Sequence, residues 1–65
     1  MQATLQQPTV TIAYYTVQDV MTILGVQRTK AQDVIRELND ELESKGYRRW
    51  PKGKISKKYF EERYL

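Results

Sequence analysis

The sequence predicts a mainly α-helical domain with three helices and a small β-hairpin, and three observations lead to this prediction. Residues 17–24 and 28–45 carry apolar side chains at the spacing of an amphipathic helix. A glycine follows each segment, at positions 25 and 46, where helices commonly end. A Pro-Lys-Gly-Lys turn then precedes a third short helical segment, residues 57–64. The length of 65 residues indicates one domain, close to the smallest size that folds without disulfides or metals.

Residues 1–9 contain mainly Gln, Thr and Pro, and we expect them to form a flexible tail. The folded domain is expected to cover residues 10–65. Polar and apolar side chains alternate from Val10 to Tyr15, which suits a short strand or an extended arm against the core.

The first helix has clear start and stop signals. Thr16 is a good N-cap, and Asp19 stands in the first turn, where a carboxylate favours the free N–H groups. Gly25 ends the helix as a left-handed cap, and Val26 supplies the hydrophobic contact that often follows such a cap. One apolar stripe is predicted to be buried: Val17, Val20, Met21 and Leu24.

The second helix is predicted to run from Arg28 to about Lys45, with Gly46 as its stop. Two i, i+4 ion pairs are expected on it, Arg36 with Asp40 and Glu41 with Lys45. A short helix, a glycine turn and a longer helix form the helix-turn-helix arrangement. The buried stripe consists of Ala31, Val34, Ile35, Leu38 and Leu42.

Residues 47–56 read YRRWPKGKIS and are predicted to form a two-stranded hairpin, or wing. Its turn covers Pro51 to Lys54, and the chain returns at Ile55. Ser56 is expected to cap the last helix, residues 57–64. The aromatic side chains are assigned to the core in preference to stacking on single-stranded bases, and they are Tyr47, Trp50, Tyr59, Phe60 and Tyr64.

Charge is segregated along the chain, although the formal net charge is only +3. Seven basic residues and no acidic one lie between Lys45 and Lys58, whereas four acidic residues and no basic one lie between Glu37 and Glu43. A polyanionic partner would therefore meet one part of the surface and avoid another.

Several classes of function are disfavoured. The chain has no cysteine and no histidine, which excludes disulfides, thiol nucleophiles, histidine metal sites and imidazole acid–base catalysis. We find no phosphate-binding glycine loop and no nucleophile–base pair. We expect no enzyme, no cofactor and no metal. The sequence has no signal peptide and no apolar run that could span a membrane, so a cytoplasmic protein is expected.

Double-stranded DNA is the predicted partner, because the second helix has a basic start and an acidic end. In a helix-turn-helix the start of the second helix enters the major groove, where Arg, Gln and Thr can read base edges or phosphates. The alternative is a helical hairpin with a solvated polar face. Acidic residues near a helix C-terminus oppose the helix dipole, and we interpret them as keeping that half off the phosphates. The residues of this helix that are predicted to face the DNA are Arg28, Thr29, Lys30, Gln32 and Arg36.

The wing is predicted to contact the phosphate backbone or the minor groove through Arg48, Arg49, Lys52 and Lys54, and Thr16 to make a phosphate contact beside the first helix. About four or five phosphate contacts would give a log–log salt slope of roughly −4. The alternative is a basic face that serves only solubility.

The stretch TVQDVMTILGVQRTKAQDVIREL resembles the MerR-like winged helix-turn-helix domains. With the closing segment KKYFEERY, the chain from Tyr14 to Leu65 is similar to the small excisionases of phages and integrative conjugative elements. Two features depart from the pattern: Gln27 stands where Ser or Thr usually caps the second helix, and that helix is unusually long.

The resemblance implies that the second helix reads the major groove and that Arg49, Lys52 and Lys54 of the wing touch the backbone or minor groove. It also implies an architectural factor, of which several copies bend DNA and help an integrase towards excision. One recognition helix reads few base pairs, so cooperative self-association is expected. A transcription regulator of a phage or mobile element with the same fold, and a protein-interaction module, are the alternatives.

Overall fold

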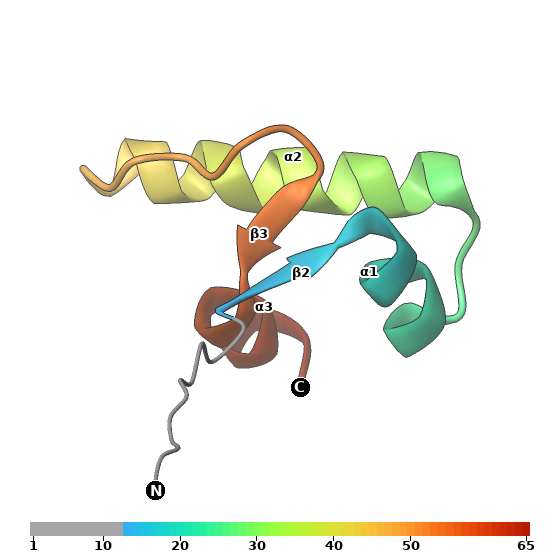
Figure 1. Cartoon of the computed structure of the whole chain (residues 1–65). Coiled ribbons are helices and arrows are strands. Elements are labelled where there is room, and N and C mark those ends of the chain that lie inside the picture. The colour runs from blue at the N-terminus through green and yellow to red at the C-terminus, as the bar shows by residue number, and fades with distance from the viewer. Residues whose placement is uncertain (1–12) are drawn as a thin grey trace, which may run out of the picture.

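The computed structural model describes residues 13–65, in which three helices surround a small antiparallel sheet (Figure 1). The mainly helical fold class is confirmed. The predicted tail and the first part of the predicted strand, residues 10–12, lie outside the described residues. In chain order the elements are β2 (Tyr14–Thr16), α1 (Val17–Leu24), α2 (Arg28–Ser44), β3 (Lys54–Ser56) and α3 (Lys57–Tyr64).

Helix α1 begins and ends where its local sequence predicts. The hydroxyl oxygen of Thr16 accepts a hydrogen bond from the N–H of Asp19 at 3.3 Å, and the Asp19 carboxylate accepts from the N–H of Thr16 at 3.0 Å. Gly25 has a φ of 67°, outside the helical range, so the helix ends there. A residue with a side chain would be strained at this φ, which explains the glycine. The N–H of Val26 then bonds back to the Met21 carbonyl at 3.1 Å. These reciprocal bonds satisfy backbone groups that a two-turn helix would otherwise leave free.

Helix α2 carries most of the core on one face. Its N-cap, Gln27, makes no side-chain capping bond, and Lys45 follows its last residue. The predicted stripe is buried, but of the α1 stripe only Val20 is fully buried. One polar residue, Asn39, is also buried on α2, with 1% of its surface exposed. The buried residues of α2 are Ala31, Val34, Ile35, Leu38, Asn39 and Leu42.

The two strands pair differently from the predicted hairpin. Strand β3 pairs antiparallel with β2, with Tyr15 opposite Ile55, and residues 47–50 form no strand. The strand that pairs with β3 therefore comes from the segment before α1, and not from the segment directly after α2. This pairing connects the first described element with the fourth, which local sequence patterns cannot reveal because the partners lie about forty positions apart.

Helix α3 closes the core from below in Figure 1. Ser56 caps it, accepting from the N–H of Tyr59 at 3.2 Å, as predicted. Phe60 has no exposed surface, and its ring meets that of Tyr15 edge-on at 5.3 Å. The assignment of all five aromatics to the core is wrong for Tyr47, which is 65% exposed, and for Tyr64, which lies outside the buried core. Tyr64 is 43% exposed and stacks on the outer side of Phe60.

Three carboxylates in the acidic half of α2, those of Asp40, Glu41 and Glu43, have partners within the protein. Our interpretation that the acidic residues keep this half of the helix off the phosphates stays a prediction. Asp40 and Glu43 both bind Arg49, at 2.9 and 2.8 Å. These carboxylates therefore contribute to local structure.

The expected i, i+4 ion pairs on α2 do not form. Arg36 binds Asp33 at 2.7 Å instead of Asp40. Glu41 accepts from the Tyr59 hydroxyl at 2.6 Å and from Arg63 at 3.3 Å, which ties α3 to α2. The ammonium group of Lys45 lies 4.9 Å from the centre of the Tyr59 ring. Arg36 thus pairs with a closer neighbour on the same helix, whereas Glu41 and Lys45 have tertiary partners on α3.

We predict that Phe60→Ala lowers the free energy of unfolding by about 3–5 kcal/mol, since it removes a ring that is fully packed. Such a loss is a large part of the stability of a domain this small. Tyr64→Ala should cost less than half as much, because that ring is partly in water already. Urea denaturation followed by circular dichroism measures both, and equal losses would contradict this account of the core.

Candidate nucleic-acid interface

Residues 47–53, which we name the wing loop, run back alongside α2 and bring basic side chains to the middle of that helix (Figure 1). The loop begins at the C-terminal end of α2 and arches over the helix before it enters β3. Asn39 holds it there. Its amide nitrogen donates to the Lys54 carbonyl at 2.9 Å, and its amide oxygen accepts from the N–H of Trp50 at 3.2 Å.

The tip of the wing loop is a tight turn, as predicted. The N–H of Lys54 donates to the Pro51 carbonyl at 3.0 Å, and Gly53 has a φ of 80°. Positive φ at the third residue is what a type II turn requires, which explains the glycine. Lys52 is therefore exposed at the corner of a turn of defined geometry.

Between the wing loop and α2 lies a groove of about 890 Å³. We name it the basic groove, because among the described residues that line it there are four cations and no carboxylate. Gln32 and Arg36 come from α2, whereas Arg48, Arg49 and Lys52 come from the wing loop. Five of the predicted contact residues thus share one surface. The other five do not line it: Thr16, Arg28, Thr29, Lys30 and Lys54.

The α2 residues that are predicted to face the DNA do not all lie on the same side of the helix. Arg28, Gln32 and Arg36 follow one another at intervals of four, so they form one stripe along the helix. Lys30 is two positions from Arg28, about 200° around the helix, and belongs to the opposite flank. All of these side chains, with Thr29, are exposed. If this stripe enters the major groove, Lys30 lies on the other side of the helix and outside that contact.

Several predicted contact residues are already engaged within the protein. Arg49 is held by Asp40 and Glu43, and its hydrogen bond to Asp40 is the main cause that raises its pKa above the usual value. The ammonium group of Lys54 lies 5.4 Å from the centre of the Tyr14 ring. Arg36 is bound by Asp33.

Thr16 is both the last residue of β2 and the N-cap of α1. Its hydroxyl both accepts from the N–H of Asp19 and lies 3.1 Å from that residue's carboxylate oxygen, to which it donates. A phosphate contact from this hydroxyl would have to replace the bond to Asp19.

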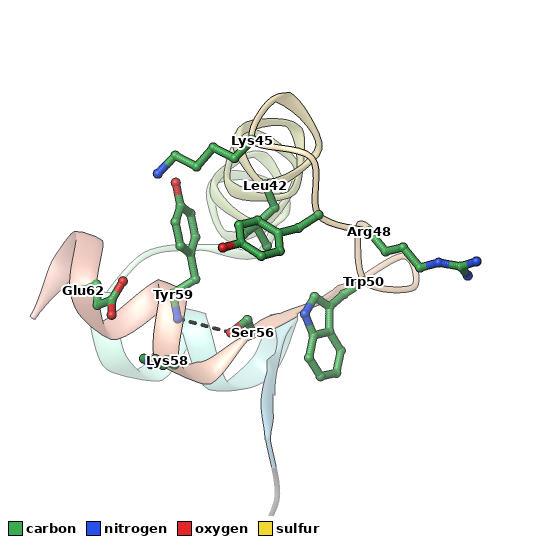
Figure 2. Close-up of a pocket in the computed structure, with 9 residues that line it drawn as sticks. Leu42, Lys45, Arg48, Trp50, Ser56, Lys58, Tyr59 and Glu62 are labelled. Atoms are coloured by element: carbon green, nitrogen blue, oxygen red, sulfur yellow. Dashed lines mark hydrogen bonds between the residues drawn. The ribbon is translucent and has the colours of Figure 1, made fainter.

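A second hollow, of about 540 Å³, lies at the C-terminal end of α2, where the wing loop and α3 meet (Figure 2). Leu42, Trp50 and Tyr59 form its apolar part. Figure 2 shows the Arg48 side chain extending away from Tyr59 and Lys45, to the outside of the wing loop. Arg48 thus borders both hollows and projects outward between them.

Asn39 is the residue that sequence reasoning missed. A polar residue attracts no attention in a search for an apolar stripe, yet Asn39 lies four positions after Ile35 and three before Leu42, on the edge of that stripe. An amide can satisfy a backbone donor and a backbone acceptor at once, which an apolar neighbour cannot. Its position in the pattern was the available signal.

Within residues 13–65 no group of three or more acidic residues is placed to hold a metal ion. None of the helices in this part of the chain is long and apolar enough to cross a membrane.

The chain is 41% identical over 51 residues to a protein of Bacillus subtilis (strain 168) named ICEBs1 excisionase. The alignment covers 78% of this chain and 78% of the relative. No protein-family model and no solved structure matches the chain. The likeness to MerR-like domains therefore stays a prediction, whereas the likeness to small excisionases extends over most of both proteins. The chain belongs to the family of small excisionases.

Proposed function

We propose that the protein binds double-stranded DNA in a sequence-dependent manner and acts as an accessory factor in excisive recombination, without catalysing a reaction itself. In this proposal the start of α2 enters the major groove, and the wing loop contacts the flanking backbone or minor groove. The excisionase relative supports the process, and the basic groove supports the mode of binding.

The observation that carries the proposal is the meeting of Gln32 and Arg36, from the α2 stripe, with the wing loop in the basic groove. The stripe carries a guanidinium and an amide, the groups that recognise guanine and adenine edges in pairs of hydrogen bonds. The wing loop adds cations beside it, and cations fix the register on the duplex through phosphates. A helix of 17 residues is about 25 Å long, so its acidic C-terminal half extends beyond a groove about 12 Å wide.

The cations differ in how free they are to meet a phosphate. Arg48 and Lys52 are exposed, and the Arg48 side chain projects from the wing loop (Figure 2). Arg49 would have to leave two carboxylates, which would then carry uncompensated charge beside the DNA. We therefore assign phosphate contacts to Arg48 and Lys52, and a bracing function to Arg49.

The architectural part of the proposal is that several copies bind adjacent sites, bend the duplex and assist an integrase. A module with one recognition helix contacts few base pairs, so its specificity has to come from more than one copy. A smooth bend of 40–90° over one site costs on the order of 1–6 kcal/mol, which added contacts can offset.

We predict that Arg28→Ala lowers the preference for the specific site over random duplex by about 1–3 kcal/mol, since it removes one base contact. Lys52→Ala should weaken binding to every duplex and flatten the log–log salt slope by about one unit. Fluorescence anisotropy at several salt concentrations measures both effects. Equal loss on specific and random DNA from both variants would refute this division, and weak, salt-independent binding by the natural protein would refute DNA binding.

We expect Arg48→Ala to flatten the salt slope by about one unit as well, because a free cation is lost. Arg49→Ala is its matched control in the adjacent position. It should leave the slope almost unchanged and should lower the midpoint of urea denaturation, since the bond to Asp40 and Glu43 is removed. A salt slope that flattens equally in both variants would show that Arg49 does leave its carboxylates to bind phosphate.

We expect a duplex that carries the protein's specific site to bend when the protein saturates it. Energy transfer between dyes at the two ends should rise with protein concentration, because bending brings the ends together. A random duplex of equal length is the control. Saturated binding without any change in transfer would exclude the architectural function while leaving DNA binding intact.

A further inference from the structure

We propose that Asn39 is a positioning residue for DNA binding: it sets the place of Lys52 by fixing both ends of the turn to the middle of α2. Asn39 itself cannot contact DNA, since only 1% of its surface is exposed. The inference rests on the proposed function, because it concerns how one of its phosphate contacts is placed.

Two hydrogen bonds carry the inference. The amide of Asn39 accepts from the N–H of Trp50 and donates to the carbonyl of Lys54, so it bonds to both sides of the turn tip. The tip is itself restrained, by the ring of Pro51, by the bond from Lys54 to Pro51 and by Gly53. Little freedom remains for the backbone of Lys52 once the two flanks are bound.

The position of Asn39 along α2 decides where the turn arrives. Arg36 lies three residues earlier, about 4.5 Å along the helix axis, and Gln32 lies about 10 Å earlier. A turn bound at Asn39 therefore lies next to the helical turn that carries Arg36. Gln32 and Arg36 both line the basic groove together with Lys52. The spacing between the helix contacts and the wing contact is thus built into α2.

Other contacts cannot replace this clamp. The ion pairs of Arg49 hold the wing loop nearer its start, and they are exposed to water, where such pairs contribute little. The pairing of β3 with β2 begins only at Lys54. Between Arg49 and Lys54, Asn39 supplies the described bonds from α2 to the backbone of the loop.

The test measures whether the contribution of Lys52 depends on Asn39. In the natural protein Lys52→Ala should flatten the log–log salt slope of duplex binding by about one unit. In an Asn39→Ala background, the same change should have much less effect, because the released turn no longer holds Lys52 at its phosphate. Val34→Ala is the matched control, since it shortens another buried side chain of α2 that does not line the basic groove. In that background the full effect of Lys52→Ala should remain.

Trp50 gives a second readout that needs no DNA. It is the only tryptophan of the chain, it is half-buried, and its ring centre lies 5.6 Å from that of Tyr14. Asn39→Ala should shift its fluorescence emission to longer wavelength while the helical circular dichroism is retained, and Val34→Ala should not. If Asn39→Ala fails to fold, Asn39→Leu replaces it, because leucine fills about the same buried volume and removes both the donor to Lys54 and the acceptor for Trp50.

The outcomes separate the two proposals. An undiminished effect of Lys52→Ala in the Asn39 variant, with unchanged Trp50 emission, overturns the positioning role and leaves DNA binding standing. A loss of the Lys52 effect in the Val34 background as well overturns it too, since general destabilisation then explains the result. Absence of any salt-dependent duplex binding by the natural protein overturns both proposals.

Discussion

The side-chain amide of Asn39 joins three consecutive parts of the chain: helix α2, the wing loop and strand β3. It is the one polar residue fully buried among residues 13–65, and both its donor and its acceptor are used by backbone groups of the loop. A buried backbone group without a partner costs about 1–3 kcal/mol, so the loop is stable in this position and less stable elsewhere. The clamp thus contributes to the place of β3, whose pairing with β2 begins at Lys54.

The carboxylates of α2 act mainly on the protein itself. Asp40 and Glu43 neutralise Arg49, and Glu41 joins α2 to Tyr59 and Arg63 of α3. The basic segment after α2 is therefore less positive in space than in sequence, and within the wing loop the cations without a carboxylate partner are Arg48 and Lys52. A few free cations on a restrained loop suit a protein that must take up a defined register on DNA, because fixed charges select one arrangement of phosphates where mobile ones accept many.

Small size makes each of these connections important. Within the part of the chain that the structure describes, the core consists of nine buried apolar residues, drawn from α1, α2, β3 and α3. A domain with so few buried side chains has no reserve of stability, and the strands, three residues each, would not persist alone. Caps at Thr16, Gly25 and Ser56 satisfy the helix ends, and the edge-on contact of Tyr15 with Phe60 joins the sheet to α3. The surface proposed to bind DNA is thus supported directly by the core.

The sequence by itself determined the three helices and their limits, because caps and amphipathic stripes are local: Thr16 and Asp19, Gly25 and Ser56 act within a few residues of themselves. It also determined the turn at Pro51–Lys54 and the family. Only the tertiary structure decided the partner of β3, the clamp by Asn39 and the pairing of Arg49 with Asp40 and Glu43. These depend on which segments meet in space, and that meeting is set by the packing of the whole core rather than by any neighbouring residues.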